Sequence, residues 1–478
     1  MLATNSQATR LESETTAFQP VRMIEVELSQ PLQPISTYDA QTKRHYQRAQ
    51  VLVRLHTRPI GMIDLSLGKD GLSVDLCANQ IWRNLQRAIN DHLREDGLPE
   101  VDTLGVEGLT HSNEPHCVQE RNRLLAEAPF ASVILCTRDR PEHLTTCLSS
   151  LLSLEYPHYE IIVVDNAPRT SATADLIREH YSHLPQIHYV REARPGLSWA
   201  RNCGLRLAQG AIVACIDDDE WATPLWLAEI AKGFRAADNV ACVTGMIMPG
   251  EIETRAQAWF EQFGGHSKGR GFERVIANTT THRVPNPIYP IPAFGAGGNM
   301  AFQASVLRAL GGFDVALGTG TFTFGGEDTA AFFEVITRGY TLVFEPAALV
   351  RHFHRRDYAD LCQQLYGYGV GLTAFFSRCV FNDPRRILDL IGILPQAVHY
   401  LLGPRSERRA RMRADYPKEL NLLQYRGMLY GPFAYLCSRW HLRHIANQFN
   451  PREARISDPF AANNASSELG AVLPHELE

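Results

Sequence analysis

The sequence predicts an α/β fold with a doubly wound, mostly parallel sheet, joined to a small N-terminal α+β domain and a helical C-terminal region. Two observations support this prediction. Apolar strand patterns alternate with helical patterns from residue 129 to about residue 357. One strand, residues 211–216, also runs directly into the acids Asp217-Asp218-Asp219-Glu220. A buried strand can continue into carboxylates only where these lie at its end, in a cleft.

Strands and helices follow one another in order through this central region. The segments predicted are strand 132–136, a helix from Pro141, strand 159–164, a helix from Thr173, strand 186–190, helix 199–209 capped by Ser198, and strand 211–216. Further along, helix 329–338 precedes strand 340–344. This alternation is typical of a parallel sheet with helices on both faces.

The flanking regions have different patterns. Residues 18–128 combine strand alternation at 21–28 and 49–67 with helical spacing around Ile81, and their polar stretch 102–128 is predicted to be a linker. Residues 358–455 are predicted to be helical and basic, and the polar tails 1–17 and 456–478 to be disordered.

Composition limits the classes of protein. The chain has 478 residues, of which 45% are hydrophobic and 21% charged, as expected of a soluble enzyme. Its ten cysteines show no CxxC pair or zinc-like spacing, so we expect buried thiols in a reducing compartment. Without an apolar signal core or a run of about 18 apolar residues, we expect neither secretion nor a membrane span, and a cytoplasmic protein that does not bind nucleic acid.

The formal charge of −5 is unevenly distributed. Residues 384–444 hold eleven Arg or Lys against four Asp or Glu, and contain the interrupted apolar stretches 387–402 and 422–440. This region could lie peripherally on an anionic membrane, at its inner face. A helical subdomain with a solvated basic face would give the same pattern.

Polar residues follow the strands of the predicted sheet at the edge where ligands bind in such folds. They are Thr137-Arg138, Asp165 and the acids 217–219. Oxygen ligands at a strand end suit Mg²⁺ or Mn²⁺, which commonly share their remaining positions with phosphates. A solvated acidic turn is the alternative.

The ligand class follows partly by exclusion. The turn 136–141 has no glycine, so neither a dinucleotide fingerprint nor a phosphate loop is present there. Metal and arginine would have to hold a phosphate instead. Asp165 can accept hydrogen bonds from a nucleobase or ribose, and Arg194 and Arg201 can offer forked donors to an anion. Each residue alone could be a turn or cap element, but together they indicate a nucleotide-diphosphate cleft.

Residues 131 to about 357 resemble a family 2 glycosyltransferase with the GT-A fold. The matching segments are 132–140, 162–166, 196–204, Ile216-Asp217-Asp218-Asp219, Gly297-Gly298-Asn299-Met300, Gly311-Gly312-Phe313-Asp314 and Gly325-Gly326-Glu327-Asp328. Residues 1–125 and the C-terminal hundred lie outside the resemblance.

The resemblance implies roles for individual residues. Thr137, Arg138 and Asp165 would hold the base and ribose of a nucleotide sugar, with Arg194, Arg201, Asp217 and Asp218 also on the donor. Asp219 would bind the metal. His352 would complete the metal or diphosphate site, or else form an exposed polar pair with His354.

The acceptor side of the site follows from the same resemblance. Asp328 would be the base that deprotonates the acceptor hydroxyl, although a plain helix cap is the alternative. The acceptor would lie against Gly297, Gly298, Asn299 and Glu327. One in-line displacement with a single base predicts inversion at the anomeric carbon.

These inferences predict an inverting, metal-dependent glycosyltransferase that adds one sugar in glycan or glycoconjugate synthesis. Processive synthases of the group carry a QxxRW motif, and Leu436 stands here in place of its glutamine. Two other classes stay open: a metal-dependent phosphoryl hydrolase, and a nucleotide-sugar-binding protein without catalysis.

Overall fold

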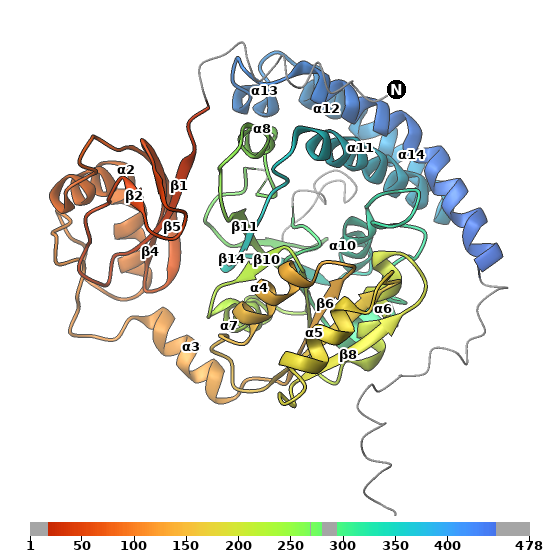
Figure 1. Ribbon diagram of the computed structural model, residues 1–478, viewed down its shortest axis with the longest axis horizontal. Helices are drawn as coiled ribbons and strands as arrows, with labels where there is room; N and C mark the ends of the chain where they lie inside the picture. Colours follow the sequence, from red (N-terminus) through yellow and green to blue (C-terminus); the bar gives the residue numbers. More distant parts are fainter. Residues whose placement is uncertain (1–17, 268, 280–293, 446–478) are drawn as a thin grey trace, which may run out of the picture.

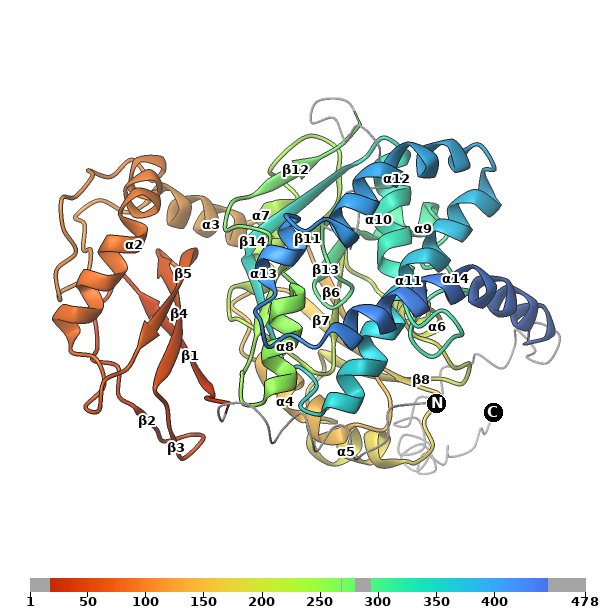
Figure 2. The same cartoon turned by 90° about the horizontal axis from the view of Figure 1, so that it is seen from above.

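The computed structural model describes residues 18–267, 269–279 and 294–445, and the statements below concern those residues. The predicted disordered tails, residues 1–17 and 456–478, lie outside them. Figures 1 and 2 show a small N-terminal domain beside a central α/β domain, with the C-terminal helices along one edge of the central domain.

The N-terminal domain is α+β, as predicted. Its main sheet has the strand order β1-β4-β5, and a long helix packs on β5. The elements are β1 (Val21–Glu27), β2 (Tyr38–Asp39), β3 (Arg44–His45), β4 (Arg48–Leu55), β5 (Arg58–Ser66) and α2 (Val74–Glu95). Ser73 caps α2, because its side chain accepts a hydrogen bond from the backbone of Leu76.

The predicted linker 102–128 contains a helix that the sequence analysis missed. This helix, α3 (His116–Ala126), begins directly after Pro115 and packs against α7 (Trp226–Gly233) of the central domain. Lys232 of α7 forms an ion pair with Glu120 of α3 at 2.9 Å. The polar residues of this segment therefore belong to a helix. One side of this helix contacts the central domain and the other side faces solvent.

The central sheet is mostly parallel, as predicted. Its strand order is β10-β14-β11-β13-β9-β6-β7-β8, with β12 paired to β14. The strands are β6 (Ala131–Thr137), β7 (Tyr159–Asn166), β8 (Ile187–Glu192), β9 (Ile212–Asp217), β10 (Glu220–Ala222), β11 (Val240–Pro249), β12 (Val275–Ala277), β13 (Met300–Gln303) and β14 (Thr341–His352). β10, β12 and β13 run antiparallel to their neighbours.

Helices flank this sheet. They are α4 (Pro141–Leu151), α5 (Ala172–His180), α6 (Leu197–Leu207), α7, α8 (Arg255–Phe263), α9 (Ala304–Ala309) and α10 (Glu327–Thr337). The predicted cap of α6 was wrong: the cap position is Gly196, at φ 131°, and the Ser198 hydroxyl donates to the carbonyl of Leu317. Ser198 thus ties α6 to a distant loop.

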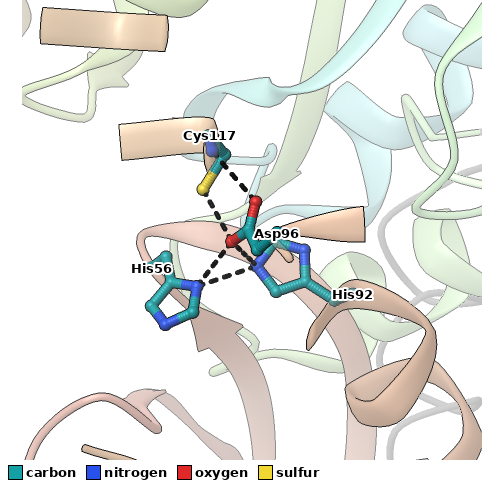
Figure 3. A group of neighbouring side chains, drawn as sticks. All are labelled: His56, His92, Asp96 and Cys117. Carbon is teal, nitrogen blue, oxygen red and sulfur yellow. Dashed lines mark hydrogen bonds and ion pairs between the residues drawn. The ribbon is translucent and has the colours of Figure 1, made fainter. Parts of the chain in front are cut away.

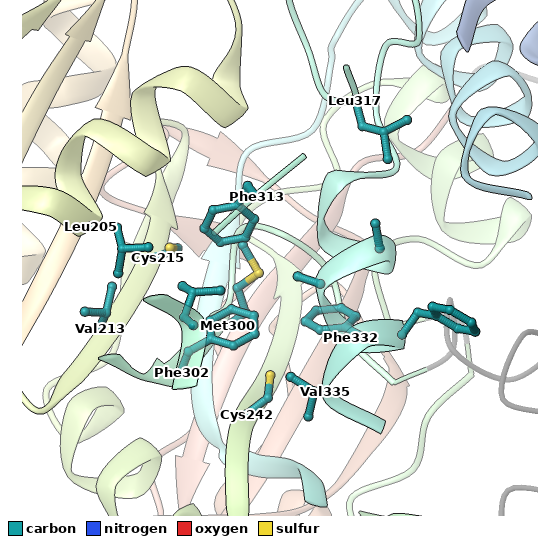
Figure 4. Close-up of a cluster of buried hydrophobic side chains, with 14 of the residues drawn as sticks. Leu205, Val213, Cys215, Cys242, Met300, Phe302, Phe313, Leu317, Phe332 and Val335 are labelled. Carbon is teal, nitrogen blue, oxygen red and sulfur yellow. The ribbon is translucent and has the colours of Figure 1, made fainter. Parts of the chain in front are cut away.

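One cluster of the core fixes the start of α10. Figure 4 shows Phe332 and Val335 of α10 against Met300 and Phe302 of β13. Phe302 and Phe332 are stacked, with their ring centroids 6.3 Å apart. Because β13 pairs with β9, this packing holds α10 in a fixed position relative to the acidic strand end.

The C-terminal region is helical, as predicted. It consists of α11 (Tyr358–Asn382), α12 (Arg386–Leu402), α13 (Glu407–Arg411) and α14 (Lys418–Ile445). Glycines let α11 and α14 approach closely: a Cβ on Gly369 would lie 2.1 Å from the Gln424 carbonyl, and one on Gly427 would lie 2.2 Å from the Tyr366 carbonyl.

One helical stretch of the described chain is long and apolar enough to cross a membrane, judged by length and composition alone. It runs from Arg386 to Arg411, with a mean hydropathy of 1.3 and 6% of its window buried. The sequence predicts no such span, because Asp389 and His399 interrupt the apolar run.

Candidate functional site

Strand register brings the predicted donor-side residues to one edge of the sheet. Thr137 at the end of β6 pairs with Asp165 of β7, and Cys136 pairs with Asp217 at the end of β9. The parallel strands therefore present Thr137, Asp165 and the acids after β9 side by side, as the sequence predicted.

Arg201 lies beneath these acids and joins the two halves of the site. It is 1% exposed. Its Nη2 atom donates to Asp217 Oδ1 at 3.1 Å and to the Gly297 carbonyl at 2.9 Å, and its Nη1 atom donates to Glu327 Oε1 at 2.8 Å. The guanidinium is thus enclosed by protein acceptors, and the predicted direct contact of Arg201 with a donor anion does not fit this structure.

Asp218 and Asp219 face a guanidinium at the surface of the site. Thr137 Oγ1 donates to Asp218 Oδ2 at 2.7 Å, and Arg140 Nη1 reaches Asp218 at 3.1 Å and Asp219 at 3.3 Å. Burial and the neighbouring Asp219 raise the pKa of Asp218 to about 6, against the opposing charge of Arg140. The Thr137 hydroxyl therefore already has a hydrogen-bond acceptor, Asp218, in this structure.

Glu220 is the third buried acid of the segment 217–220, after Asp218 and Asp219. Burial, with the charges of Asp217 and Asp219, raises the pKa of Glu220 well above its usual range. Its Oε2 atom accepts a hydrogen bond from the Asp217 backbone at 3.1 Å. This concentration of carboxylates favours the binding of a cation beside the segment 217–220.

His352 approaches the same loop from β14. Pairing of β10 with β14 sets Glu220 opposite His352, and the Phe353 amide donates to the Asp219 carbonyl at 3.1 Å. His352 Nε2 lies 3.5 Å from Asp219 Oδ1. Burial, together with the neighbouring His354 and Arg355, lowers the pKa of His352 to about 3 although Asp219 opposes this. A neutral imidazole beside a carboxylate is a donor set that fits a divalent metal.

His354 is the second histidine of the predicted pair and is buried. Its Nδ1 atom lies 2.8 Å from His352 Nδ1, and its Nε2 atom lies 2.8 Å from Glu261 Oε1. The two rings therefore face the same side of β14, as expected for positions i and i+2. The exposed polar pair considered from the sequence is excluded, because His352 and His354 are only 6% and 4% exposed.

Asp165 is buried at the end of β7. Tyr189 donates its hydroxyl to Asp165 Oδ2 at 2.9 Å, whereas Oδ1 is buried without a hydrogen-bond partner among the described residues. Burial raises the pKa of Asp165 to about 6. A buried acceptor atom without a partner at a ligand-binding edge fits the predicted contact with a base or ribose.

The two remaining donor-side arginines differ. Arg194 is held by the protein: its Nε and Nη2 atoms donate to Glu192 at 2.8 and 2.7 Å, and its guanidinium carbon lies 3.8 Å from the Trp199 ring centroid. Arg138 is partly exposed and lies 3.9 Å from Asp139. Of these two side chains, Arg138 is therefore the one oriented toward solvent at the rim.

The acceptor side begins at α10. Gly326, at φ 93°, precedes the helix, and Glu327 and Asp328 occupy its first turn. Asp328 Oδ1 accepts from the Thr329 amide at 2.6 Å, and its side chain is partly exposed. Glu327 is buried on Arg201, and burial with the adjacent Asp328 raises the pKa of Glu327 to about 7. Asp328 is thus the accessible carboxylate of the two.

The glycine-rich turn before β13 supports the site. A Cβ on Gly298 would lie 2.1 Å from Glu220 Oε1, and one on Gly297 would lie 3.0 Å from Arg201 Nη2. These two positions need glycine because the acidic loop and Arg201 pack against the backbone. The predicted contact of Gly297 and Gly298 with an acceptor stays a prediction.

The structure contradicts the predicted contact of Asn299 with an acceptor. It is fully buried, and its side chain accepts from Trp226 Nε1 at 2.9 Å while donating to the carbonyls of Met246 at 2.9 Å and Ala348 at 2.8 Å. These bonds use the amide within the core, so Asn299 does not reach an acceptor. It holds the turn in place.

Sequence reasoning missed Arg140 and Arg355. Arg355 Nη2 lies 3.5 Å from Asp219 Oδ2, the same oxygen that Arg140 Nη1 approaches to 3.3 Å. Both side chains are about one-third exposed, at 37% for Arg140 and 35% for Arg355. The arginine-rich run after His352 was a signal for Arg355, but only the tertiary structure shows which arginine turns toward the loop.

Comparisons with known proteins identify the family. Residues 132–311 match the family described as Glycosyl transferase family 2. Glycosyltransferase AglE of Haloferax volcanii is 31% identical over 289 residues, which are 57% of this chain and 84% of that protein. The chain belongs to glycosyltransferase family 2.

Other relatives are more distant. Glucosyl-dolichyl phosphate glucuronosyltransferase of Haloferax volcanii is 23% identical over 39% of this chain, and chondroitin synthase of Escherichia coli is 24% identical over 34%. The chain spans 56% and 25% of the lengths of these two proteins. A mannosyltransferase structure from Pyrobaculum calidifontis, in complex with GDP-Man and Mn²⁺, aligns over 73% of this chain and 86% of its own at 18% identity and a TM-score of 0.40, too low to support a functional argument.

We predict that Asn299→Ala destabilises the fold. Three buried hydrogen-bonding groups would lose their partner, so the free energy of unfolding should fall by about 2–4 kcal/mol in urea denaturation. Asn84→Ala, at an exposed position on α2, is the control and should cost under about 0.5 kcal/mol. An Asn299→Ala protein as stable as the parent would contradict the structural role.

We also predict that Arg201→Met destabilises the protein by about 3–5 kcal/mol, because it leaves Glu327 buried without its counter-charge. Adding Glu327→Gln should restore part of the loss, since an amide needs no cation. Urea denaturation of the single and double variants measures both effects. If Arg201→Met kept full stability and only weakened donor binding, Arg201 would be a ligand contact after all.

Proposed function

We propose that this chain transfers one sugar from a nucleotide-diphosphate sugar to an acceptor hydroxyl, with inversion at the anomeric carbon, in glycan or glycoconjugate synthesis. One observation carries the proposal. The buried Arg201 bridges Asp217 of the acidic loop and Glu327 beside Asp328. The metal side and the base side of the predicted reaction therefore belong to one site.

A divalent cation, Mg²⁺ or Mn²⁺, would be held by Asp219 and His352, with Asp217 nearby. The fit is supported by the excess of buried carboxylates and by the neutral imidazole that faces Asp219. When bound, such an ion stabilises the negative charge of a departing nucleoside diphosphate as a Lewis acid. Oxygen donors with one nitrogen are compatible with either metal.

The donor would lie along the carboxyl edge of β6 and β7. The unpartnered Asp165 Oδ1 would accept a hydrogen bond from the base or ribose, with Arg138 at the rim. Arg140 and Arg355 flank Asp219 and could turn toward the diphosphate when a donor arrives. Arginine suits this task because its fork matches phosphate oxygens.

Asp328 would act as the base. As an acceptor oxygen attacks the anomeric carbon, its proton passes to the Asp328 carboxylate and the bond from that carbon to the diphosphate oxygen breaks. The leaving nucleoside diphosphate takes the bonding electron pair. A single in-line displacement of this kind inverts the anomeric centre.

Asp328→Asn tests the mechanism. We predict a loss of transfer of about 10²–10⁴-fold, because the amide cannot take the proton, while the donor with Mn²⁺ still raises the Tm in a thermal-shift screen of nucleotide sugars. Asp219→Asn is the matched variant, and it should lose the metal-dependent part of that shift. Product anomers are read by NMR.

Two outcomes would redirect the assignment. Release of inorganic phosphate without sugar transfer would favour the phosphoryl hydrolase. Donor binding with a turnover that Asp328→Asn leaves unchanged would favour a binding protein without catalysis. A retained anomeric configuration would exclude the single displacement.

We further propose a cytoplasmic protein that contacts the inner face of a membrane peripherally through residues 384–444. α12 exposes an apolar stripe at helical spacing, formed by Ile387, Ile391, Leu394, Val398 and Leu402. α14 exposes a second one, formed by Leu422, Leu429, Phe433, Leu436 and Trp440. Exposed basic residues lie in the same region, at positions 385, 405, 409, 413, 418, 426 and 443. Apolar stripes with basic neighbours complement an anionic lipid surface.

Vesicle sedimentation checks this contact. Leu388→Glu with Leu394→Glu should reduce binding to anionic vesicles at low salt by about tenfold or more, because both side chains are exposed on α12. Leu76→Glu, at an exposed position on α2, is the control and should bind like the parent. The proposal would be contradicted if both variants sedimented equally with the vesicles. It would also be contradicted if light scattering showed that the parent is a dimer and the α12 variant a monomer.

A further inference from the structure

A cluster of four potential metal ligands lies in the N-terminal domain, away from the acidic loop. His56, His92, Asp96 and Cys117 are each buried, and one ligand atom from each lies within 4.8 Å of the others. Figure 3 shows their side chains converging on one point. The sequence alone does not predict the cluster, because its residues span 61 positions without a zinc-like spacing.

Three separate segments deliver these ligands. His92 lies in the last turn of α2, Asp96 caps the same helix, and Cys117 lies in the first turn of α3. His56 lies in the turn between β4 and β5, where it and Thr57 have positive φ values of 54° and 72°. A ligand set assembled at element ends in this way needs the complete domain fold.

Hydrogen bonds fix the segments around the cluster. Glu27 accepts from the backbone amides of His56 at 3.0 Å and Thr57 at 2.9 Å, which holds the left-handed turn. Asp96 Oδ1 accepts from the Cys117 amide at 2.9 Å. The backbone around three of the four ligands is thereby preorganised, as expected of a binding site.

The ligand atoms have the spacing of a small coordination shell. His56 Nδ1 lies 3.2 Å from His92 Nε2 and 2.7 Å from Asp96 Oδ2. Asp96 Oδ2 also lies 3.1 Å from His92 Nε2 and 3.0 Å from Cys117 Sγ. Ligands of a tetrahedral ion with bonds of about 2.0–2.3 Å lie roughly 3.3–3.5 Å apart, so the shell would open by about half an ångström.

We propose that His56, His92, Asp96 and Cys117 bind a structural Zn²⁺ ion. Two imidazoles, a carboxylate and a thiolate suit zinc, and the nitrogen and sulfur donors disfavour Mg²⁺ and Ca²⁺. Four protein ligands complete a tetrahedral shell, so the site has a structural role. Binding exchanges the Cys117 thiol proton for the metal and releases that proton to solvent.

An access route and a consequence follow from the surroundings. An open pocket of about 350 Å³ reaches Asp96 and Cys117 from the surface, next to Lys232.

Since α3 packs on α7 of the central domain, an ion that joins α3 to α2 would fix the N-terminal domain relative to the catalytic one. Figure 1 shows α3 in this connecting position.

The first test is metal content. Full-length protein purified without chelator should contain about one zinc ion per chain, measured by inductively coupled plasma mass spectrometry. Cys117→Ser and His92→Ala should each lose most of it. Cys77→Ala, another buried thiol of the same domain, should retain it. Asp219→Asn should also retain it, which separates this ion from any ion at the acidic loop.

A second measurement is made mainly on the parent protein. Exchange of zinc for Co²⁺ in the parent should give visible d–d bands and a thiolate charge-transfer band, the latter absent in Cys117→Ser. A strong zinc chelator should lower the parent's Tm by about 5 °C or more. Parent protein that takes up no zinc or cobalt, with a Tm unchanged by chelator, would show that Asp96 is only the centre of a hydrogen-bond network.

Discussion

The structure of the site depends on one buried cation, the guanidinium of Arg201. It neutralises Asp217 and Glu327 at once and also holds the carbonyl of Gly297. Three segments far apart in sequence, the end of β9, the turn before β13 and the start of α10, are therefore positioned by one side chain. A buried carboxylate without such a partner would be protonated or would destabilise the fold.

Charge explains the rest of the site's organisation. Asp218, Asp219 and Glu220 are all buried, and burial together with the charges of Asp219 and Asp217 raises the pKa values of Asp218 and Glu220. Such a loop is strained electrostatically until cations approach it. Arg140 and Arg355 supply part of that charge at the surface of the loop. The proposed divalent ion would supply the rest of the positive charge.

The N-terminal and C-terminal regions place this domain in a larger context. α3 connects the N-terminal sheet to α7, and the helices α12 and α14 expose apolar stripes on the opposite part of the molecule. The two proposals rest on independent residues.

The sequence by itself determined the alternating elements of the central domain, the edge at which Asp165 and Asp217 lie, and the family. Strand patterns and strand-end acids are local signals, and parallel pairing brings strand ends together by rule. It did not reveal α3, whose polar face made the segment resemble a linker. Side-chain partners were beyond local signals as well. Only the tertiary structure decided that Arg201 and Asn299 bond within the protein, and that His56 meets Cys117, because these contacts join residues 16 to 126 positions apart.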